Sequence, residues 1–411
     1  MKRILDRGRN GWRKTLARSG PAVALAVLLA GCSSVGFAPG QGSAGFGGQS
    51  AQTTPATLPA ASGRSFGKGP VRVALLLPLS GDPALAQVGT SLANAAELAV
   101  EFIEKTDTMP DNITVVLKDT GDSVGGASRA ATEAVAEGAS LILGPLRADQ
   151  VTVVGSVARS AGINVIGFSN NSGAASAGVF LLSVLPEVEM RRSMSFIQTR
   201  GKRALAGIFP NTDYGRIQEG AFRQAAADLG INARAVYNFT SEAEARTVVQ
   251  QLVPLLQSGQ IDCLFLPDRA TAPSFAVMME EAGIGLGRIQ VVGSTEWNGD
   301  ANIYNTPWLA GGFYPAVDDA GFLALRTEYT ARFASEPHAL STIAYTATIL
   351  ANASSLSMAT PKYDRAALTA PSGFNGRDGV FRFLGDGRSQ YALAIKEVTI
   401  GGAKLADGPK L

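Results

Sequence analysis

The sequence predicts an α/β fold made of two Rossmann-like lobes, each built on a parallel sheet, and two observations carry this prediction. From Pro70 onward, short apolar runs alternate with longer amphipathic stretches, which is the pattern of strands that alternate with helices. The same scheme then starts again near Arg203, where ALAGIFP (204–210) repeats the character of VALLLP (73–78). Two lobes of similar plan, joined by a hinge of several chain segments, account for both observations.

The first half of the pattern predicts four strands and three helices. The strands are short, apolar and rich in β-branched residues, and they fall at 71–77, 113–118, 141–143 and 164–168. The first helix is expected at 88–105, because apolar side chains recur there on one face, at Leu92, Ala95, Ala96, Ala99, Val100 and Ile103. Further helices are expected at 126–137 and 149–161.

The second half predicts the same alternation and then a return of the chain. Its expected strands are 203–209, 233–238, 263–266 and 290–293, and its expected helices are 216–229, 242–257 and 272–282. Helices at 321–334 and 341–355 follow, and 379–383 with 391–400 are expected to form a closing hairpin around Gly385-Asp386-Gly387. We therefore assign 70–186 and 313–365 to lobe 1, 187–312 and 366–402 to lobe 2, and 403–411 to a tail. Several connections of this kind permit the lobes to close over a cleft.

The N-terminus has the features of a secretion signal. Seven basic residues precede the apolar run 21–30, which as a helix would span only about 15 Å, half of the roughly 30 Å of a bilayer core. Leu29-Ala30-Gly31-Cys32 resembles the lipobox of bacterial lipoproteins, in which the cysteine accepts diacylglycerol. The resemblance implies that 1–31 is removed and that lipidated Cys32 anchors the chain. Ser33 in place of aspartate then implies the periplasmic side of the outer membrane.

Residues 33–69, which complete the segment 32–69, are expected to form a flexible tether. They are dominated by Gly, Ser, Ala, Pro, Thr and Gln, with Arg64 and Lys68 as the only charges, so they cannot form a core of their own. A tether of this length has a root-mean-square span of roughly 35 Å. The domain can therefore work away from the membrane that anchors it.

Charge and reactive side chains exclude several classes of function. Removal of 1–31 leaves 29 Lys+Arg and 33 Asp+Glu, so the mature chain has a formal charge of −4, and nucleic-acid binding is not indicated. Cys263 lies in an apolar run and is interpreted as a buried hydrophobe. The single histidine, His338, is not part of a Ser-His-Asp or Cys-His motif. The sequence also contains neither a His/Cys/Asp/Glu spacing that suits zinc nor a GxxxxGK[ST] phosphate-binding loop. We expect no enzyme activity, no metal and no cofactor.

A ligand cleft is the better candidate, because ligands of open α/β sheets collect beyond the carboxyl ends of the strands. The polar and aromatic residues that follow the predicted strands are the candidates. From the first lobe they are Ser80, Gly81, Asp119, Thr120, Gly144, Ser169, Asn170 and Asn171. From the second lobe they are Asn211, Asp213, Tyr214, Asp268, Arg269, Thr295, Glu296 and Trp297. The same residue types also serve as helix caps and turn formers, and this structural interpretation stays open for each of them.

Several motifs together resemble type I periplasmic binding proteins of the leucine/isoleucine/valine-binding kind. They are VRVALLLPLSG (71–81) with Gly89, ILGPL (142–146), NVIGFS (164–169), DYG (213–215), and FNG (374–376) to Asp386-Gly387. The resemblance covers about 70–400. Within that superfamily, the lipobox, the tether and Gly144-Pro145-Leu146 look most like the penicillin-binding protein activator lipoproteins, which stimulate peptidoglycan synthases and are not known as enzymes.

The resemblance leaves two main functions open, and an orphan sensor that presents its ligand state to a receptor is a third. Amino-acid binders of the superfamily hold the ligand's ammonium with an acid of the second lobe, a role for which Glu296 is placed, and its carboxylate with hydroxyls such as those of Ser169 and Ser172. The loop after Gly144 continues instead with Arg147-Ala148-Asp149-Gln150, where Asp149 would repel a carboxylate. The leading hypothesis is therefore an adaptor that activates a penicillin-binding protein by contact. The alternative is the amino-acid-binding lipoprotein of an ABC importer.

Overall fold

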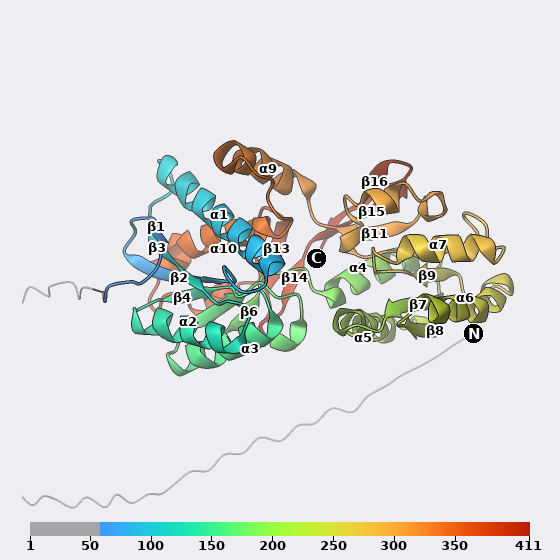
Figure 1. Ribbon diagram of the computed structural model, residues 1–411, viewed down its shortest axis with the longest axis horizontal. Coiled ribbons are helices and arrows are strands. Elements are labelled where there is room, and N and C mark those ends of the chain that lie inside the picture. The colour runs from blue at the N-terminus through green and yellow to red at the C-terminus, as the bar shows by residue number, and fades with distance from the viewer. Residues whose placement is uncertain (1–57) are drawn as a thin grey trace, which may run out of the picture. The chain divides into compact units, whose positions relative to one another are not determined.

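The computed structural model describes residues 58–411. The predicted signal peptide, the predicted lipidation at Cys32 and most of the predicted tether fall on 1–57 and lie outside these residues. Within the described part, two large sheets form the centres of two lobes (Figure 1). The predicted α/β class with two lobes is confirmed. Both sheets are mixed rather than purely parallel, because antiparallel strands are added to a parallel centre.

The first lobe contains a six-stranded sheet in the order β1-β3-β2-β4-β5-β6. Its strands are β1 (Ser65–Phe66), β2 (Val71–Leu77), β3 (Ile113–Asp119), β4 (Leu141–Leu143), β5 (Asn164–Gly167) and β6 (Val179–Leu181). The helices between them are α1 (Pro83–Lys105), α2 (Val124–Ala136), α3 (Ala148–Ser160) and the short η1 (Ser172–Ala174). Val73, Leu75 and Leu77 belong to the core shared with α1, whereas Ala74 and Leu76 belong to the core shared with α2 and α3. The alternation of β2 thus buries both faces of the sheet.

The second lobe contains a seven-stranded sheet in the order β16-β15-β11-β10-β9-β7-β8. Its strands are β7 (Ala204–Pro210), β8 (Asn232–Phe239), β9 (Cys263–Phe265), β10 (Gln290–Val292), β11 (Phe313–Ala316), β15 (Leu393–Thr399) and β16 (Gly402–Lys410). Its helices are α4 (Pro186–Thr199), α5 (Asp213–Asp228), α6 (Glu242–Gln257), α7 (Ala272–Glu281) and α8 (Ala301–Tyr304), with the short η2 (Thr295–Trp297) and η3 (Pro307–Leu309). Cys263 is buried and unpaired in this core, as its apolar run predicts.

The remaining elements complete the first lobe. They are α9 (Asp319–Phe333), α10 (Ser341–Asn352), α11 (Ser354–Ser357), α12 (Arg365–Leu368) and a three-stranded sheet of β12 (Phe374–Gly376), β13 (Gly379–Phe383) and β14 (Ser389–Tyr391). The chain passes between the lobes after β6, after β11 and after β14. Three such passages agree with the expected hinge of several segments.

Two of the predicted lobe boundaries are wrong. Residues 313–316 were assigned to lobe 1, but β11 pairs with β10 and β15 in the second lobe, so the chain returns only after Ala316. Residues 366–391 were assigned to lobe 2, but Phe381, Phe383 and Tyr391 are buried in the first-lobe core. Both errors have one physical cause: a strand of three to five residues is assigned to a sheet by its long-range partners, which its own composition does not reveal.

The predicted closing hairpin and tail also differ from the structure. Strand β13 pairs with β14 inside the three-stranded sheet, whereas β15 pairs with β11 and β16 of the second lobe. The expected tail 403–411 is largely strand β16, an edge strand on β15. Its sequence GAKLADGPK carries glycine, proline and charge, as edge strands often do, and these features hide it from a hydrophobic pattern.

The end of the expected tether is fixed to the first lobe. Strand β1 pairs antiparallel with β3, and the Lys118 ammonium donates to the carbonyl oxygen and hydroxyl of Ser62 (2.9 and 2.8 Å) and to Glu137 (2.7 Å). Burial alone would raise the pKa of Glu137, but hydrogen bonds from Lys118 and Ser62 hold it below its ordinary value. The tether prediction is therefore wrong for 62–69.

Candidate functional site

Most of the first-lobe candidates are engaged in hydrogen bonds within their own loops. The Asp119 carboxylate accepts the N–H of Leu79 (2.8 Å), the hydroxyl of Ser80 (2.6 Å) and the N–H of Gly121 (2.8 Å). Burial would raise the pKa of Asp119, but these hydrogen bonds outweigh it and keep the pKa below its ordinary value. Gly81 has φ +90° and takes the left-handed turn conformation that glycine favours. Ser80, Gly81 and Asp119 thus form a turn.

The loop after β4 is also closed on itself. Gly144 has φ +81°, and a Cβ there would lie 2.2 Å from the carbonyl oxygen of Leu76, so the position requires glycine. Arg147 then pairs with Asp149 at 2.9 Å, which holds the pKa of the Asp149 carboxyl below its ordinary value. Asp149 lies in the first turn of α3, and Arg147 is the N-cap residue of this helix. The guanidinium that could receive an anion is already bound to a carboxylate.

Most polar groups of the loop after β5 also form hydrogen bonds within the loop or with the neighbouring helix α4. The Ser169 hydroxyl accepts the N–H of Asn171 (3.2 Å), and the Asn171 side chain accepts the N–H of Gly173 (2.9 Å). The Ser172 hydroxyl donates to Glu187, at the start of α4. The Asn170 side chain lies within reach of the Tyr214 hydroxyl in the second lobe. Asn170 and Tyr214 are therefore two predicted residues that the fold brings together.

In the second lobe, three candidates have local structural roles. Arg216 donates to Asn211 (3.0 Å) and pairs with Asp213, whose side chain is 97% exposed. Asp268 accepts the N–H and the hydroxyl of Thr271 in the turn before α7. These residues shape loops at the carboxyl ends of β7 and β9.

Trp297 is a core residue. Its side chain is fully buried in the second-lobe core, where it packs against Gly293 and beside Tyr314. Its assignment to the ligand cleft is therefore wrong. Strand β10 ends at Val292, and the chain then enters the 3-10 turn η2, which directs the ring of Trp297 inward.

The structure gathers three acids that we call the acid cluster: Glu187, Glu189 and Glu296. Glu189 is 3% exposed and accepts the N–H (3.1 Å) and the hydroxyl (2.7 Å) of Thr295. Burial raises the pKa of Glu189 to about 7, opposed by the Thr295 hydrogen bonds and reinforced by the charges of Glu296 and Glu187. Burial also raises the pKa of Glu296; the charge of Asp268 raises this pKa further, and the charge of Arg269 lowers it. Among residues 58–411, none of the three forms an ion pair.

Tyr214 and Gln218 border the acid cluster. Burial raises the pKa of the Tyr214 hydroxyl, and the charges of Glu189 and Glu296 raise it further. Gln218, one turn along α5, is 1% exposed, and neither atom of its amide has a partner at hydrogen-bond geometry within the described chain. The three carboxylates form no ion pair within the described chain, so together with this hydroxyl and amide they can hold an ammonium or another cation.

Sequence reasoning found Glu296, Tyr214 and Asn170 but missed Glu187, Glu189 and Gln218. No helix was predicted at 186–199, so the two acids in the first turn of α4 were not placed at a strand end. A signal was present, because Pro186 followed by Glu187 and Glu189 is a typical helix start. Gln218 lies within a predicted helix, and only the folded structure shows that it is buried.

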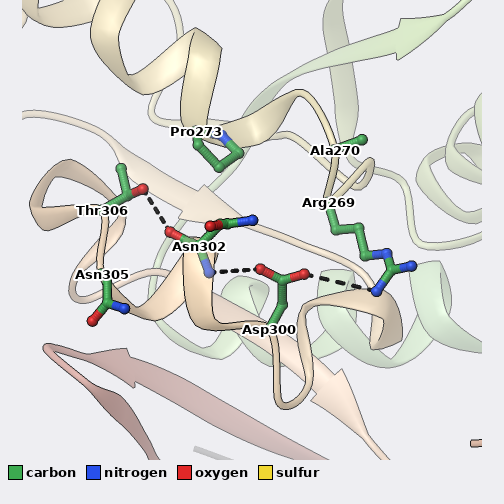
Figure 2. Close-up of a pocket in the computed structure, with 7 residues that line it drawn as sticks. All are labelled: Arg269, Ala270, Pro273, Asp300, Asn302, Asn305 and Thr306. Atoms are coloured by element: carbon green, nitrogen blue, oxygen red, sulfur yellow. Dashed lines mark hydrogen bonds and ion pairs between the residues drawn. The ribbon is translucent and has the colours of Figure 1, made fainter.

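A hollow lies beside the acid cluster rather than at it. Its volume is about 590 Å³, and Figure 2 shows Arg269 reaching toward Asp300 across it, with Asn302, Asn305 and Thr306 along one side. The Arg269 and Asp300 side chains are 3.7 Å apart. A second hollow of about 460 Å³ lies between α6 and α7. The charges of the larger hollow compensate each other, so we place the candidate site at the acid cluster.

The fold and this site define a two-lobed α/β binding protein. Residues 70–395 match the sequence pattern of the family described as periplasmic binding protein, and the chain belongs to that family. None of the curated proteins matches the chain. Within residues 58–411, no helix is both long and apolar enough to cross a membrane, and no group of three or more His, Cys, Asp or Glu is arranged to hold a metal.

Three solved structures with the same fold are described as an ABC transporter protein, a substrate-binding protein and a solute-binding protein. A putative branched-chain amino acid ABC transporter protein from Rhodospirillum rubrum is 18% identical, with a TM-score of 0.69, over 82% of this chain and 99% of that one. A substrate-binding protein from Desulfitobacterium hafniense in complex with Leu is 15% identical, with a TM-score of 0.61, over the same shares. A solute-binding protein from R. palustris in complex with benzoate is 17% identical, with a TM-score of 0.56, over 83% and 98%. At these identities the likeness concerns the fold.

Proposed function

We propose that the protein is a non-catalytic periplasmic lipoprotein, anchored at Cys32 to the outer membrane, that activates a penicillin-binding protein by direct contact. The observation that carries the proposal is the state of the polar groups at the candidate site. On the first-lobe side, Ser80, Asp119, Arg147 and Ser169 are each engaged within their own loops. The side chains at the site that form no ion pair in the described chain are the carboxylates of Glu187, Glu189 and Glu296.

A free amino acid is poorly matched to such a site. Its carboxylate needs unengaged donors, and near Glu187, Glu189 and Glu296 it would be repelled. The two-lobed fold without a matched zwitterion site supports a role in protein contact. The sequence features of a lipid anchor and a tether support a role in which the domain contacts a partner away from the membrane that anchors it.

The proposal is tested with the chain that begins at Ser33 and a purified class A penicillin-binding protein. We expect the two proteins to bind, and the rate of glycan-strand synthesis to rise when the Ser33 chain is added. The lipidated chain and its Cys32→Ser variant, expressed in cells, test the anchor by membrane fractionation. A Ser33 chain that neither binds nor stimulates any class A synthase contradicts the adaptor function.

A second candidate function is amino-acid binding for an ABC importer, and the acid cluster favours it. Glu189, Glu296 and the Tyr214 hydroxyl are suited to hold an α-ammonium. A ligand at about 1,000 times its dissociation constant stabilises a protein by roughly 4 kcal/mol, so free amino acids can be screened by thermal unfolding. A shift that Glu296→Gln abolishes, and that the exposed control Glu280→Gln retains, would favour the importer function over the adaptor function.

A further inference from the structure

We propose that the edge of the second lobe formed by the amino ends of its parallel strands docks on an anionic phospholipid bilayer. This inference is independent of the acid cluster, which lies beyond the carboxyl ends of the same strands. It concerns the orientation of the lobe at a membrane surface, and it goes beyond the adaptor function.

Five cations gather where the chain enters three of four adjacent strands. Arg200, Lys202 and Arg203 precede or begin β7, Arg234 lies at the start of β8, and Arg288 precedes β10. Since β8, β7, β9 and β10 are neighbours in the sheet and run parallel, their starts share one edge that is about 15 Å wide. We call these five residues the basic face.

The basic face is not neutralised by acids within the described residues. None of its five side chains forms an ion pair there, although Arg234 donates to Gln260 and Arg200 lies over the rings of Phe196 and Phe313. Asp262 lies at this edge, and its carboxylate accepts the backbone N–H groups of Arg203 and Ala204. Three other acids near it, Asp228, Glu281 and Glu397, are paired with Arg191, Arg246 and Lys404, which are not part of the basic face. A chain whose mature charge is −4 thus carries a local excess of positive charge.

Two large apolar side chains project from the same edge. Leu286 lies in the turn before β10 and is 56% exposed, and Ile400 lies in the turn after β15 and is 66% exposed. Strand β15 runs antiparallel to β11, with Glu397 opposite Phe313, so the end of β15 reaches the edge at which β10 and β11 begin. Helix dipoles can explain cations near helix C-termini, but they do not explain exposed leucine and isoleucine.

Cations next to exposed apolar tips match the chemistry of an anionic bilayer. The cations are attracted to the lipid phosphates, and the tips can enter the interface between headgroups and acyl chains. The part of the chain outside the described residues carries the apolar run 21–30 and Cys32, so a membrane is the nearest anionic surface on our proposal. The tether keeps the domain near the membrane, and the basic face orients it.

The test is cosedimentation of the Ser33 chain with phosphatidylcholine vesicles that contain or lack phosphatidylglycerol. Each Lys or Arg near an anionic surface changes binding about fivefold, so the triple variant Lys202→Gln, Arg203→Gln, Arg288→Gln should bind on the order of a hundredfold more weakly. Arg200 is left in place because of its ring contacts. The matched control Arg129→Gln, Lys362→Gln, Arg365→Gln removes three cations from the first lobe and should bind like the unmodified chain.

The apolar tips have a separate expectation. Leu286→Ser with Ile400→Ser should retain binding at low salt and lose the part that survives high salt, because salt screens the charges but not the inserted side chains. Variants with unchanged melting temperatures are compared. Equal binding to both vesicle types, no binding to either, or equal losses in the triple variant and its control would overturn the proposal. Tighter binding to polyglutamate than to vesicles, unaffected by the Leu286/Ile400 variant, would identify an acidic protein as the occupant instead.

Discussion

Glu189 is the side chain at which burial and charge are most directly opposed. Its carboxyl has a folded-state pKa of about 7, against about 4.5 in an unfolded chain, because burial disfavours the charged form. The unfolded state therefore loses its proton first as the pH rises. The contribution of Glu189 to the free energy of unfolding is therefore most favourable below about pH 4.5. It becomes less favourable as the pH rises to about 7 and is constant above that. The difference is at most about 3 kcal/mol.

Glu189→Gln should remove this pH dependence. The glutamine oxygen can still accept the N–H of Thr295, and the side chain carries no charge. We expect the variant to be more stable than the unmodified chain at pH 8, by up to about 3 kcal/mol, and to differ little at pH 4.5. Urea unfolding at the two pH values measures the difference, with exposed Glu280→Gln as the control. An equal effect at both pH values would show that Glu189 is ionised without cost in the folded protein.

Lys118 is the residue that fixes the end of the tether. Its side chain is 3% exposed and pairs with Glu137, which is 12% exposed. Lys118→Met should cost about 3 to 5 kcal/mol, because it leaves a buried carboxylate without its cation. The exposed pair Lys105–Glu101 provides the control, since Lys105→Met should cost less than about 0.5 kcal/mol. Trypsin cleavage after Arg64 should become faster only in the Lys118 variant, and an unchanged rate would mean that β1 holds the segment by itself.

The roles of individual polar residues depend on partners that the sequence does not reveal. The sequence places Glu296 and Asn170 after strands, and in the structure they follow β10 and β5. Whether a polar residue faces a ligand or caps a turn depends on its partners. Ser80 and Asp119 bind each other, whereas the three acids of the cluster form no ion pair within 58–411. A single sequence does not reveal those partners, and Trp297 shows the same limit for a side chain that turns into the core.

At the scale of the elements, helix α5 contains two glycines with opposite roles. A Cβ on Gly215 would lie 1.9 Å from the carbonyl oxygen of Pro210, so the first turn of α5 approaches the end of β7 only because no side chain intervenes. A Cβ on Gly220 would meet nothing within 4 Å. The same residue type is therefore required at one position and unfavourable at the other.

Gly215→Ala and Gly220→Ala should change stability in opposite directions. Gly220→Ala should stabilise the protein by about 0.5 to 1 kcal/mol, because alanine loses less backbone freedom in a helix. Gly215→Ala should destabilise it by roughly 1 to 3 kcal/mol or more, because the backbone must shift to relieve the contact. Thermal unfolding of both variants at one pH measures the two signs. Two stabilising substitutions would mean that β7 and α5 can separate without loss.

The sequence predicts elements best where hydrophobic periodicity is long. Helices α2, α3, α6 and α7 begin and end within about two residues of their predicted bounds, because their apolar faces are regular. Helix α1 begins five residues earlier than predicted, at Pro83 after the N-cap Asp82. Helix α4 was missed because Glu189, Arg192 and Ser193 lie on its buried side among Met190 and Met194, which conceals the period.

At the scale of the whole molecule, two lobes follow from the repeated pattern, but their boundaries do not. The strands that decide the boundaries, β11, β12 and β14, are three or four residues long, and each takes its place from distant partners. Their contribution comes from packing and ladder contacts rather than from local propensity. The same reason explains why the last strand, β16, was expected to be a tail.

Strand β16 should contribute specifically to the stability of the second lobe. It covers the edge of β15, and Arg192 of α4, which is 9% exposed, pairs with Asp407 at 2.6 Å and donates to the carbonyl oxygen of Gly408. Deletion of 402–411 removes these partners and leaves a buried guanidinium with the carbonyl oxygen of Leu393 as its acceptor. We expect a loss of at least about 3 kcal/mol in the second lobe.

Tryptophan fluorescence can isolate this effect, because the two tryptophans that follow Ser33, Trp297 and Trp308, both lie in the second-lobe core. In the truncated chain, the fluorescence transition in urea should move to lower concentration and separate from the circular-dichroism transition, which reports both lobes. Removal of exposed Leu411 alone is the control and should leave the two transitions coincident. If both probes shift together after deletion of 402–411, the lobes unfold as one cooperative unit, and β16 stabilises both lobes rather than the second lobe alone.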